Sequence, residues 1–193
     1  MTTITLTSEL DAINTMLSCI GEAPVNSIEV SGLADVDMAK AVLNEISRSV
    51  QASGWHFNQE TDFPLPRNVS GEITVPSNTL NVDTTKRFDD YDVVQRGTRL
   101  YNKTTRSFVF DKDIEVDLTL LIEWAELPEA ARQYIMTRAA RVFQARQLGS
   151  DTQHRFSEAD EAVALANFKD AEGSTGDYNM LNSSWSVGQV LDR

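Results

Sequence analysis

The sequence predicts an α+β fold: a helical bundle of about four helices with an inserted small antiparallel β-sheet or sandwich and an extended C-terminal arm. Apolar residues recur at helical spacing near both ends of the chain, whereas the middle consists of short extended runs separated by turn residues. Residues 173–193 differ again, because they are rich in Gly, Ser and Asn. These three observations carry the prediction.

We divide the chain into four segments on this basis. An N-terminal helical pair takes residues 1–56, and a β-rich insertion takes residues 57–125. A C-terminal helical pair at residues 126–172 is expected to pack with the first pair, and the extended arm takes residues 173–193. A length of 193 residues is enough for one substantial domain or two small ones that share a core.

The first two helices are predicted by their ends and by their apolar faces. Ser8 and the acidic Asp11 form a variant of the capping box, and Gly21 ends the first helix. The second helix is expected from about residue 35 to 53, before Gly54. The apolar stripes are Leu10, Ile13, Met16, Leu17 and Ile20, then Val36, Ala39, Val42, Leu43, Ile46 and Val50. The opposite face of the second helix holds Lys40, Asn44, Arg48 and Gln51.

The middle of the chain is typical of a small antiparallel β structure. Arg96-Gly97-Thr98 suits a tight connection, so a hairpin is expected there. Trp55 is expected to plug the junction between helices and strands, with a binding platform as the alternative. Proline cannot donate to a ladder, which confines Pro64, Pro66 and Pro76 to strand edges or ends. The candidate strands cover residues 57–65, 72–75, 92–95, 99–102, 107–110 and 114–124.

Helical periodicity returns at Pro128, which suits the first position of a helix. This third helix is expected to run to about Leu148 and to stop at Gly149. A fourth helix is expected from about residue 152 to 171. Its inward residues are predicted to be Phe156, Ala159, Val163 and Ala166, with Glu158, Asp160, Glu161 and Asp170 largely solvated.

Composition excludes several classes of protein. The net charge is −12, from 29 acidic and 17 basic residues, which argues against a protein that grips nucleic acid but not against one that lets DNA slide past. The single cysteine, Cys19, cannot form an intrachain disulfide and is expected to be inert. There is neither a secretory signal nor an apolar run of about 20 residues, so a soluble protein made in a cytoplasm and not inserted in a membrane is expected.

No catalytic, cofactor-binding or metal-binding residue is predicted. The sequence has no GxSxG, HExxH or Gly-rich phosphate loop, and Asp111-Lys112-Asp113 lacks the glycine and glutamate of a calcium loop. Acidic pairs such as Asp89-Asp90 and the group Glu158, Asp160 and Glu161 arise by chance in so acidic a chain. They leave one enzymatic alternative, a virion-associated carbohydrate hydrolase that uses an acidic pair. A free-standing binding module is a further option.

The third helix has an unusual set of arginines. Arg138 falls inside its apolar stripe, where a guanidinium costs stability unless it is paired or reaches solvent. We expect Arg138 to pair with a carboxylate, and Glu158 and Glu161 are the candidates. Pairing within the chain ranks first for these arginines, a contact between subunits second and a DNA contact third. The interface candidates in this helix are Arg138, Arg141 and Arg146.

The C-terminal arm combines a polar frame with apolar side chains that a solvated tail would not need. It either folds back on its own chain or, as we favour, orders on another subunit, because apolar anchors in such a frame suit coupled folding and binding. The apolar side chains include Val187, Val190 and Leu191, and the interface candidates in the arm are Tyr178, Met180, Leu181 and Trp185.

Several segments together resemble the tail tubular protein A family of T7-like short-tailed phages. They span nearly the whole chain in order, and none of them is specific alone. The segments are Glu9-Leu10-Asp11-Ala12-Ile13-Asn14, Ile20-Gly21-Glu22-Ala23-Pro24-Val25, Gln51-Ala52-Ser53-Gly54-Trp55-His56-Phe57-Asn58, Leu127-Pro128-Glu129 with Arg132, Tyr134 and Ile135, then Phe143, Arg146 and Gly149, and finally Tyr178-Asn179-Met180-Leu181.

The resemblance implies a structural adaptor, or head-to-tail connector, and not an enzyme. It implies a homo-oligomeric, dodecameric ring that connects the portal protein to the tail nozzle, a protein like tail tubular protein B. The ring would form part of the channel for DNA ejection, with transient, non-specific passage of the genome. The location implied is the virion tail, after assembly in the host cytoplasm. We expect some of the acidic surplus to line the channel and to keep DNA from adhering.

Overall fold

The computed structural model describes residues 5–29, 33–88, 90–148 and 151–176. The predicted α+β class is confirmed. None of the helices in these ranges is long and apolar enough to cross a membrane. In chain order the elements are α1 (Glu9–Cys19), α2 (Ala34–Gln51), η1 (His56–Asn58), β1 (Gln59–Leu65), β2 (Thr79–Thr84), η2 (Lys86–Phe88), β3 (Val93–Arg96), β4 (Arg99–Asn102), β5 (Ile114–Leu120), η3 (Trp124–Glu126), α3 (Glu129–Leu148) and α4 (Asp151–Thr175).

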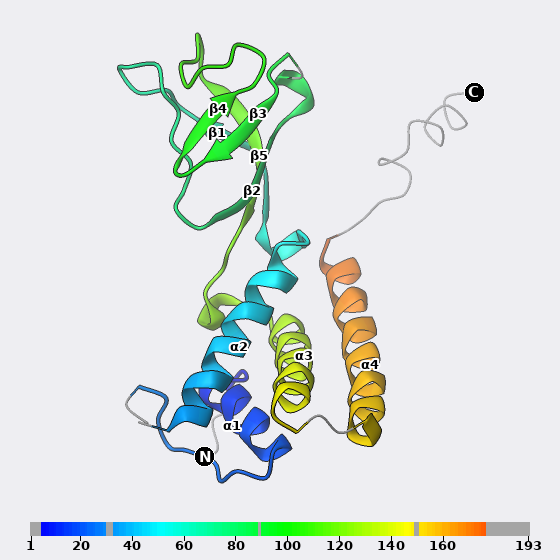
Figure 1. Ribbon diagram of the computed structural model, residues 1–193. Helices are drawn as coiled ribbons and strands as arrows, with labels where there is room; N and C mark the ends of the chain where they lie inside the picture. The colour runs from blue at the N-terminus through cyan, green and yellow to red at the C-terminus, as the bar shows by residue number, and fades with distance from the viewer. Residues whose placement is uncertain (1–4, 30–32, 89, 149–150, 177–193) are drawn as a thin grey trace, which may run out of the picture.

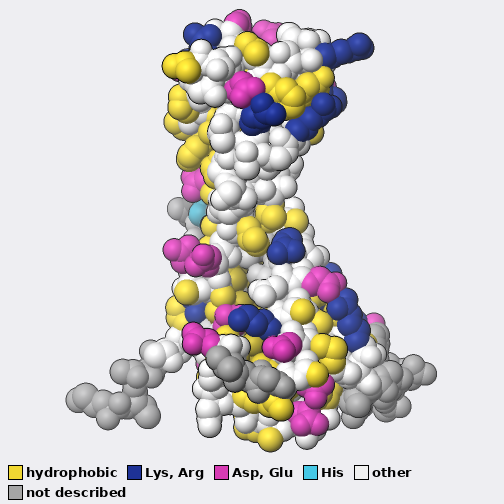
Figure 2. All heavy atoms as spheres, turned by 60° about the vertical axis from the view of Figure 1, so that its left-hand side comes forward, with side chains coloured by type: hydrophobic (Ala, Val, Ile, Leu, Met, Phe, Trp, Pro, Cys, Tyr) yellow, Lys and Arg dark blue, Asp and Glu magenta, His cyan; other side chains and the backbone are white. Residues whose placement is uncertain are grey.

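The helices gather at one end of an elongated molecule and the strands at the other (Figure 1). Each end has its own cluster of buried apolar side chains. In the space-filling view a narrow waist separates the two ends, and hydrophobic side chains are exposed on it (Figure 2). The predicted segment boundaries at residues 56 and 125 fall near this waist and stay a prediction.

Both ends of α1 are stabilised as the sequence predicts. The Ser8 hydroxyl accepts a hydrogen bond from the Asp11 amide at 3.1 Å, and the Asp11 carboxylate accepts one from the Ser8 amide at 3.0 Å. At the other end Gly21 has a φ of +84°, in the left-handed region. The Gly21 and Glu22 amides then reach the carbonyls of Ser18 and Leu17, both at 3.1 Å, which completes a Schellman motif.

Gly54 is needed where α2 gives way to the strands. Its φ is +73°, and a Cβ built there would lie 2.6 Å from the Gln59 side-chain nitrogen. Both backbone conformation and space therefore favour glycine. The predicted stripe of α2 is confirmed, since all six of its apolar residues are buried.

Phe168 lies at the centre of the aromatic packing between α4 and its neighbours. Its ring is 4.3 Å from the Trp55 ring and 5.6 Å from the Tyr134 ring, centroid to centroid. Trp55 also donates its indole N–H to the Val50 carbonyl at 2.7 Å and packs against the helical core, while its contact with the strands stays a prediction.

The predicted inward face of α4 is wrong. Ala159, Val163 and Ala166 are exposed, and the side chain of Phe156 lies outside the described residues. The helix has two apolar faces, and the one with the larger side chains is buried because it removes more apolar area from water. That face consists of Ala164, Leu165 and Phe168. The helix also runs on to Thr175, past the predicted start of the arm at residue 173.

The strands form two antiparallel units. β5 lies at the centre of a three-stranded sheet of order β1-β5-β2, and β3 and β4 form the predicted hairpin, with Arg96 opposite Arg99. β1 is an edge strand that contains Pro64, as expected for proline. Its register shifts between Glu60 and Phe63, where Asp62 has a φ of +54° in a β-bulge.

Three details of the strand prediction are wrong. Residues 72–75 and 107–110 form only isolated bridges, including one between Glu72 and Val109. β2 was not expected, because Asn and Asp are poor strand formers and only Val82 of this strand is buried. The last strand ends at Leu120, since the chain turns into η3.

We expect Phe168→Ala to lower the free energy of unfolding by about 3–5 kcal/mol, because it leaves a cavity in the helical core. Val163→Ala on the same helix is the matched control. Val163 is 61% exposed, so its change is expected to stay within about 0.5 kcal/mol. Urea denaturation of both variants measures the difference. Equal losses would show that α4 does not bury the Phe168 face.

Candidate interface surfaces

Two buried amides join the helices to the strands. The Gln51 side chain, which is 0% exposed, donates to the Ile122 carbonyl at 3.1 Å and accepts from the Ile122 amide at 2.7 Å. Asn58 donates to the carbonyls of Gln51 and Leu120, at 2.9 and 2.8 Å. The end of α2 is thereby fixed to the chain that leaves β5. The prediction that Gln51 faces solvent is wrong.

Glu172 adds a third polar contact at this junction. Its carboxylate accepts a hydrogen bond from the His56 amide at 2.7 Å, which ties the end of α4 to η1. Glu172 is buried, and helical periodicity alone gave no sign of this contact. The only sequence signal near the junction was the segment from Gln51 to Asn58, which belongs to the family resemblance.

Arg132 holds the N-terminal segment against the start of α3. It is 5% exposed and donates to three backbone carbonyls, those of Leu127 at 2.8 Å, Ala125 at 2.7 Å and Thr7 at 3.0 Å. These carbonyls accept from three nitrogens of the guanidinium fork, so the buried charge is hydrogen-bonded.

Glu129 strengthens the same attachment. Its carboxylate accepts from the Thr7 amide at 2.9 Å and from the Thr7 hydroxyl at 2.5 Å. Burial raises the pKa of the Glu129 carboxyl, but hydrogen bonds from Gln133 and Thr7 outweigh burial and leave the pKa lowered. Trp124 donates its indole N–H to the Thr7 carbonyl at 3.1 Å, so the N-terminal segment also fixes η3.

These contacts shape a groove at the waist, which we call the waist groove. It is a pocket of about 480 Å³, and its walls include Arg48 of α2, Asn78, and the residues Leu121, Ile122 and Trp124. A second pocket of about 450 Å³ shares Glu9, Trp124 and Ala125 with the waist groove and includes Leu6, which is 56% exposed. Trp124 therefore contributes apolar surface to two pockets.

The three candidate arginines of α3 all pair within the chain. Glu161 of α4 receives both Arg138, whose Nε lies 3.6 Å from the carboxylate, and Arg141, which donates to it. Arg138 also donates to the Tyr134 hydroxyl at 3.1 Å. Arg146 makes a two-pronged contact with Glu45 of α2, with both distances 2.8 Å. The carboxylate partner expected for Arg138 is present, while the role of the three at a subunit interface stays a prediction.

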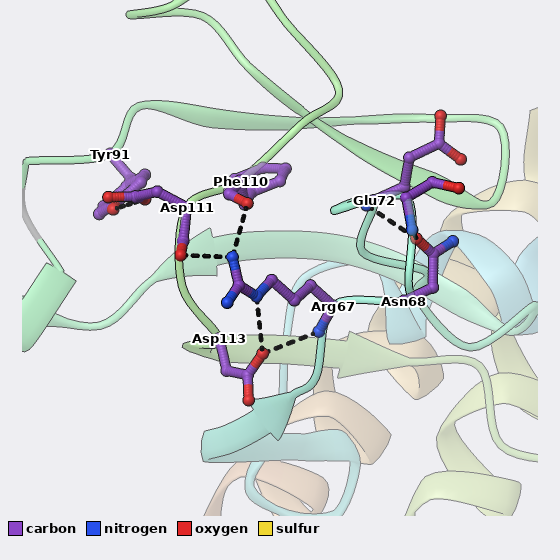
Figure 3. Close-up of polar contacts among 8 residues, drawn as sticks. Arg67, Asn68, Glu72, Tyr91, Phe110, Asp111 and Asp113 are labelled. Atoms are coloured by element: carbon purple, nitrogen blue, oxygen red, sulfur yellow. Dashed lines mark hydrogen bonds and ion pairs between the residues drawn. The ribbon is translucent and has the colours of Figure 1, made fainter.

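At the strand-rich end of the molecule, Arg67 holds the loop before β5 in place (Figure 3). Its side chain donates to the Asp111 carbonyl at 2.5 Å, and its amide donates to the Asp113 carboxylate at 3.0 Å. The Asp111 carboxylate accepts from the Tyr91 hydroxyl at 2.5 Å, which raises the pKa of Tyr91 to about 12. The two aspartates weighed for metal binding thus have protein partners.

Four carboxyls of the described residues have a shifted pKa, and Glu129 is one of them. A side-chain hydrogen bond lowers the pKa of each of three further carboxyls, from Ser8 to Asp11, from Arg146 to Glu45 and from Tyr91 to Asp111. A glycosidase needs one carboxyl with a raised pKa. Within the described ranges every carboxyl with a resolved shift has a lowered pKa.

The remaining interface candidates, Tyr178, Met180, Leu181 and Trp185, lie outside the described residues. Asp89 of the acidic pair Asp89-Asp90 does so as well.

Burial raises the pKa of the Cys19 thiol, and a hydrogen bond with Ser18 lowers that pKa by a smaller amount. This direction favours the protonated and less reactive form.

We expect Gln51→Ala to lower the free energy of unfolding by about 1–3 kcal/mol, since it leaves both backbone groups of Ile122 without a partner. The control is Asn44→Ala, an exposed position on the same helix, with an expected change within about 0.5 kcal/mol. Urea denaturation measures both. If the two variants lose the same small amount, the amide junction does not contribute to stability.

Glu129→Gln tests the N-terminal attachment through its pH dependence. A lowered folded-state pKa means that the carboxylate stabilises the fold above its ordinary pKa of 4.5, and that this contribution is lost as the pH falls through the folded-state value. We expect the variant to be less stable than the unchanged protein at pH 7, with a difference that shrinks at pH 3. Urea denaturation at both pH values measures it, and a constant difference would contradict the assignment.

Comparison with known proteins identifies the family of the chain. The sequence model of the tail tubular proteins matches residues 10–178. The chain is also 28% identical over 146 residues to Tail tubular protein A of Klebsiella phage KP34, an alignment that covers 76% of this chain and 76% of that protein. The match extends from α1 through the strands to the end of α4, so the chain belongs to the tail tubular protein family.

Proposed function

We propose that this protein is the adaptor subunit of a short phage tail, and that its copies close into a ring between the portal protein and the tail nozzle. As a member of its family the protein is a structural component of the virion tail. The observation that carries the proposal is the family match over residues 10–178. The number of twelve subunits comes from the resemblance alone.

The fixed waist supports an adaptor role. Gln51 and Asn58 join the helical and strand-rich ends through buried hydrogen bonds, which favours a constant distance and angle between two separate contact surfaces. An adaptor needs such a relation, because one end has to meet the portal and the other the nozzle.

Exposed apolar side chains on opposite sides of the helical end support a ring. α4 and α2 both pack on α3 and flank it in Figure 1. On α4 the exposed residue Val163 lies near Ala159 and Ala166, and on α2 Met38 is 45% exposed. Exposed apolar residues on two different helices of one subunit suit a head-to-tail contact, which closes into a ring when the rotation permits.

The acidic surplus supports passage of DNA through the ring. A net charge of −12 disfavours adhesion to phosphates, so a duplex can move without being held. We also propose that the protein performs no chemical step of its own, in line with the lowered carboxyl pKa values. Release of sugars from host polysaccharide, lost on replacing one acidic residue, would instead support the hydrolase.

The direct test is electron microscopy of the full-length protein mixed with its portal protein. We expect closed rings seated on one end of the portal, with an acidic lumen once the subunits are fitted. Protein that never joins the portal would contradict the adaptor role. A ring with a basic lumen would contradict the DNA channel. The free protein alone is the control, because it shows whether the ring closes without the portal protein.

A further inference from the structure

The place where the described chain stops suggests what occupies the waist groove. The last turn of α4 lies beside η1, because Glu172 bonds to His56 and the Gly176 amide bonds to the Glu172 carbonyl at 2.9 Å. The chain therefore leaves α4 at the level of the waist. In Figure 1 this end and the elements that line the groove, α2 and η3, lie on opposite sides of α3.

From this geometry we infer that residues 177–193 of one subunit dock in the waist groove of the neighbouring subunit. The inference rests on the proposed ring and identifies one contact that holds it together. An arm that leaves on one side and a groove on the other produce a head-to-tail connection, since each copy gives its arm to the next.

The reach of the arm fits a neighbour. Trp185 is nine residues past Gly176, which allows up to roughly 30 Å of extended chain. Three packed helical layers are about 30 Å across, given helix diameters and spacings of about 10 Å. Trp185 can therefore reach the near face of an adjacent subunit, and the residues after it can follow the groove.

The chemistry of the groove fits the arm. The arm offers large apolar groups, and the groove presents Leu121, Ile122 and Trp124. Its volume of about 480 Å³ lies in the range of pockets that bind compact groups, about 300–1,000 Å³. Trp is also among the residues that most often supply the binding energy of an interface.

The arm and the groove each carry charges of both signs. Arg48 has no ion pair with a described residue, and Glu9 and Glu123 line the same groove. The arm carries Asp177, Asp192 and Arg193, so Arg48 of the groove can pair with a carboxylate and Arg193 with Glu9 or Glu123. A larger groove of about 650 Å³ between β2 and β3 suits the arm less well, because its lining is mainly polar.

Cysteine cross-linking in assembled rings tests the contact. The native cysteine is first removed as Cys19→Ser in the full-length chain. Asn44→Cys, at the exposed wall of the groove, is then combined with Ser184→Cys, next to Trp185. We expect mild oxidation of portal-bound rings to give a ladder of covalent multimers. Adding Trp185→Ala is expected to lower the yield by at least about tenfold, the loss typical of a truncated anchor.

The matched control replaces Asn44→Cys with Asn81→Cys, an exposed position in the β2–β3 groove. Cross-links at residue 81 but not at residue 44 would overturn the inference. Monomers with a cross-link within one chain would also overturn it, because they indicate that the arm folds back on its own subunit. Rings that form without any multimer ladder would overturn the arm contact and leave the adaptor role intact. Failure to form rings at all would count against both.

Discussion

Gln51 and Asn58 are buried amides whose side chains complete the backbone hydrogen bonding where a helix passes into a sheet. The Gln51 side chain bonds to the backbone of Ile122, and the Asn58 side chain bonds to the carbonyls of Gln51 and Leu120. The end of α2 and the end of β5 therefore cannot separate without leaving several buried polar groups without a hydrogen-bond partner. The chain crosses the waist twice, at residues 52–58 and 121–125, and the amides hold the two crossings together. The relation between the helical and strand-rich ends follows from this local network more than from any broad apolar interface.

Arg132 and Glu129 have a similar effect on the N-terminal segment. A guanidinium shared among three carbonyls and a carboxylate bound to Thr7 fix this segment, and Thr7 in turn accepts the Trp124 indole. The waist groove is therefore built on rigid supports. A surface of this kind loses little conformational freedom on binding, which favours affinity for an incoming segment.

The sequence predicted those features that local rules determine. The capping box of α1, the stops at Gly21 and Gly54, the stripe of α2 and the β3–β4 hairpin all depend on a few adjacent residues. β2, by contrast, exists because β5 pairs with it, and its own residues are weak strand formers. The buried face of α4 was missed because two apolar faces compete and tertiary packing selects between them. Gln51 was assigned to solvent because periodicity places polar residues outside without regard to backbone partners 71 positions away.

For the interface, the sequence indicated two sets of residues. The arginines of α3 have their ion-pair partners within the same chain. Residues 177–193 of the arm lie outside the described ranges.

The bulge in β1 has a consequence for a protein proposed to stand beside many copies of itself. β1 is an open sheet edge, the kind of surface on which identical chains stack into aggregates. Pro64 removes one amide donor from that edge, and the bulge at Asp62 disrupts the row of donors and acceptors just before it. Glu60 and Asp62 add exposed negative charge. Stacking of identical chains through this edge of the sheet is thereby disfavoured.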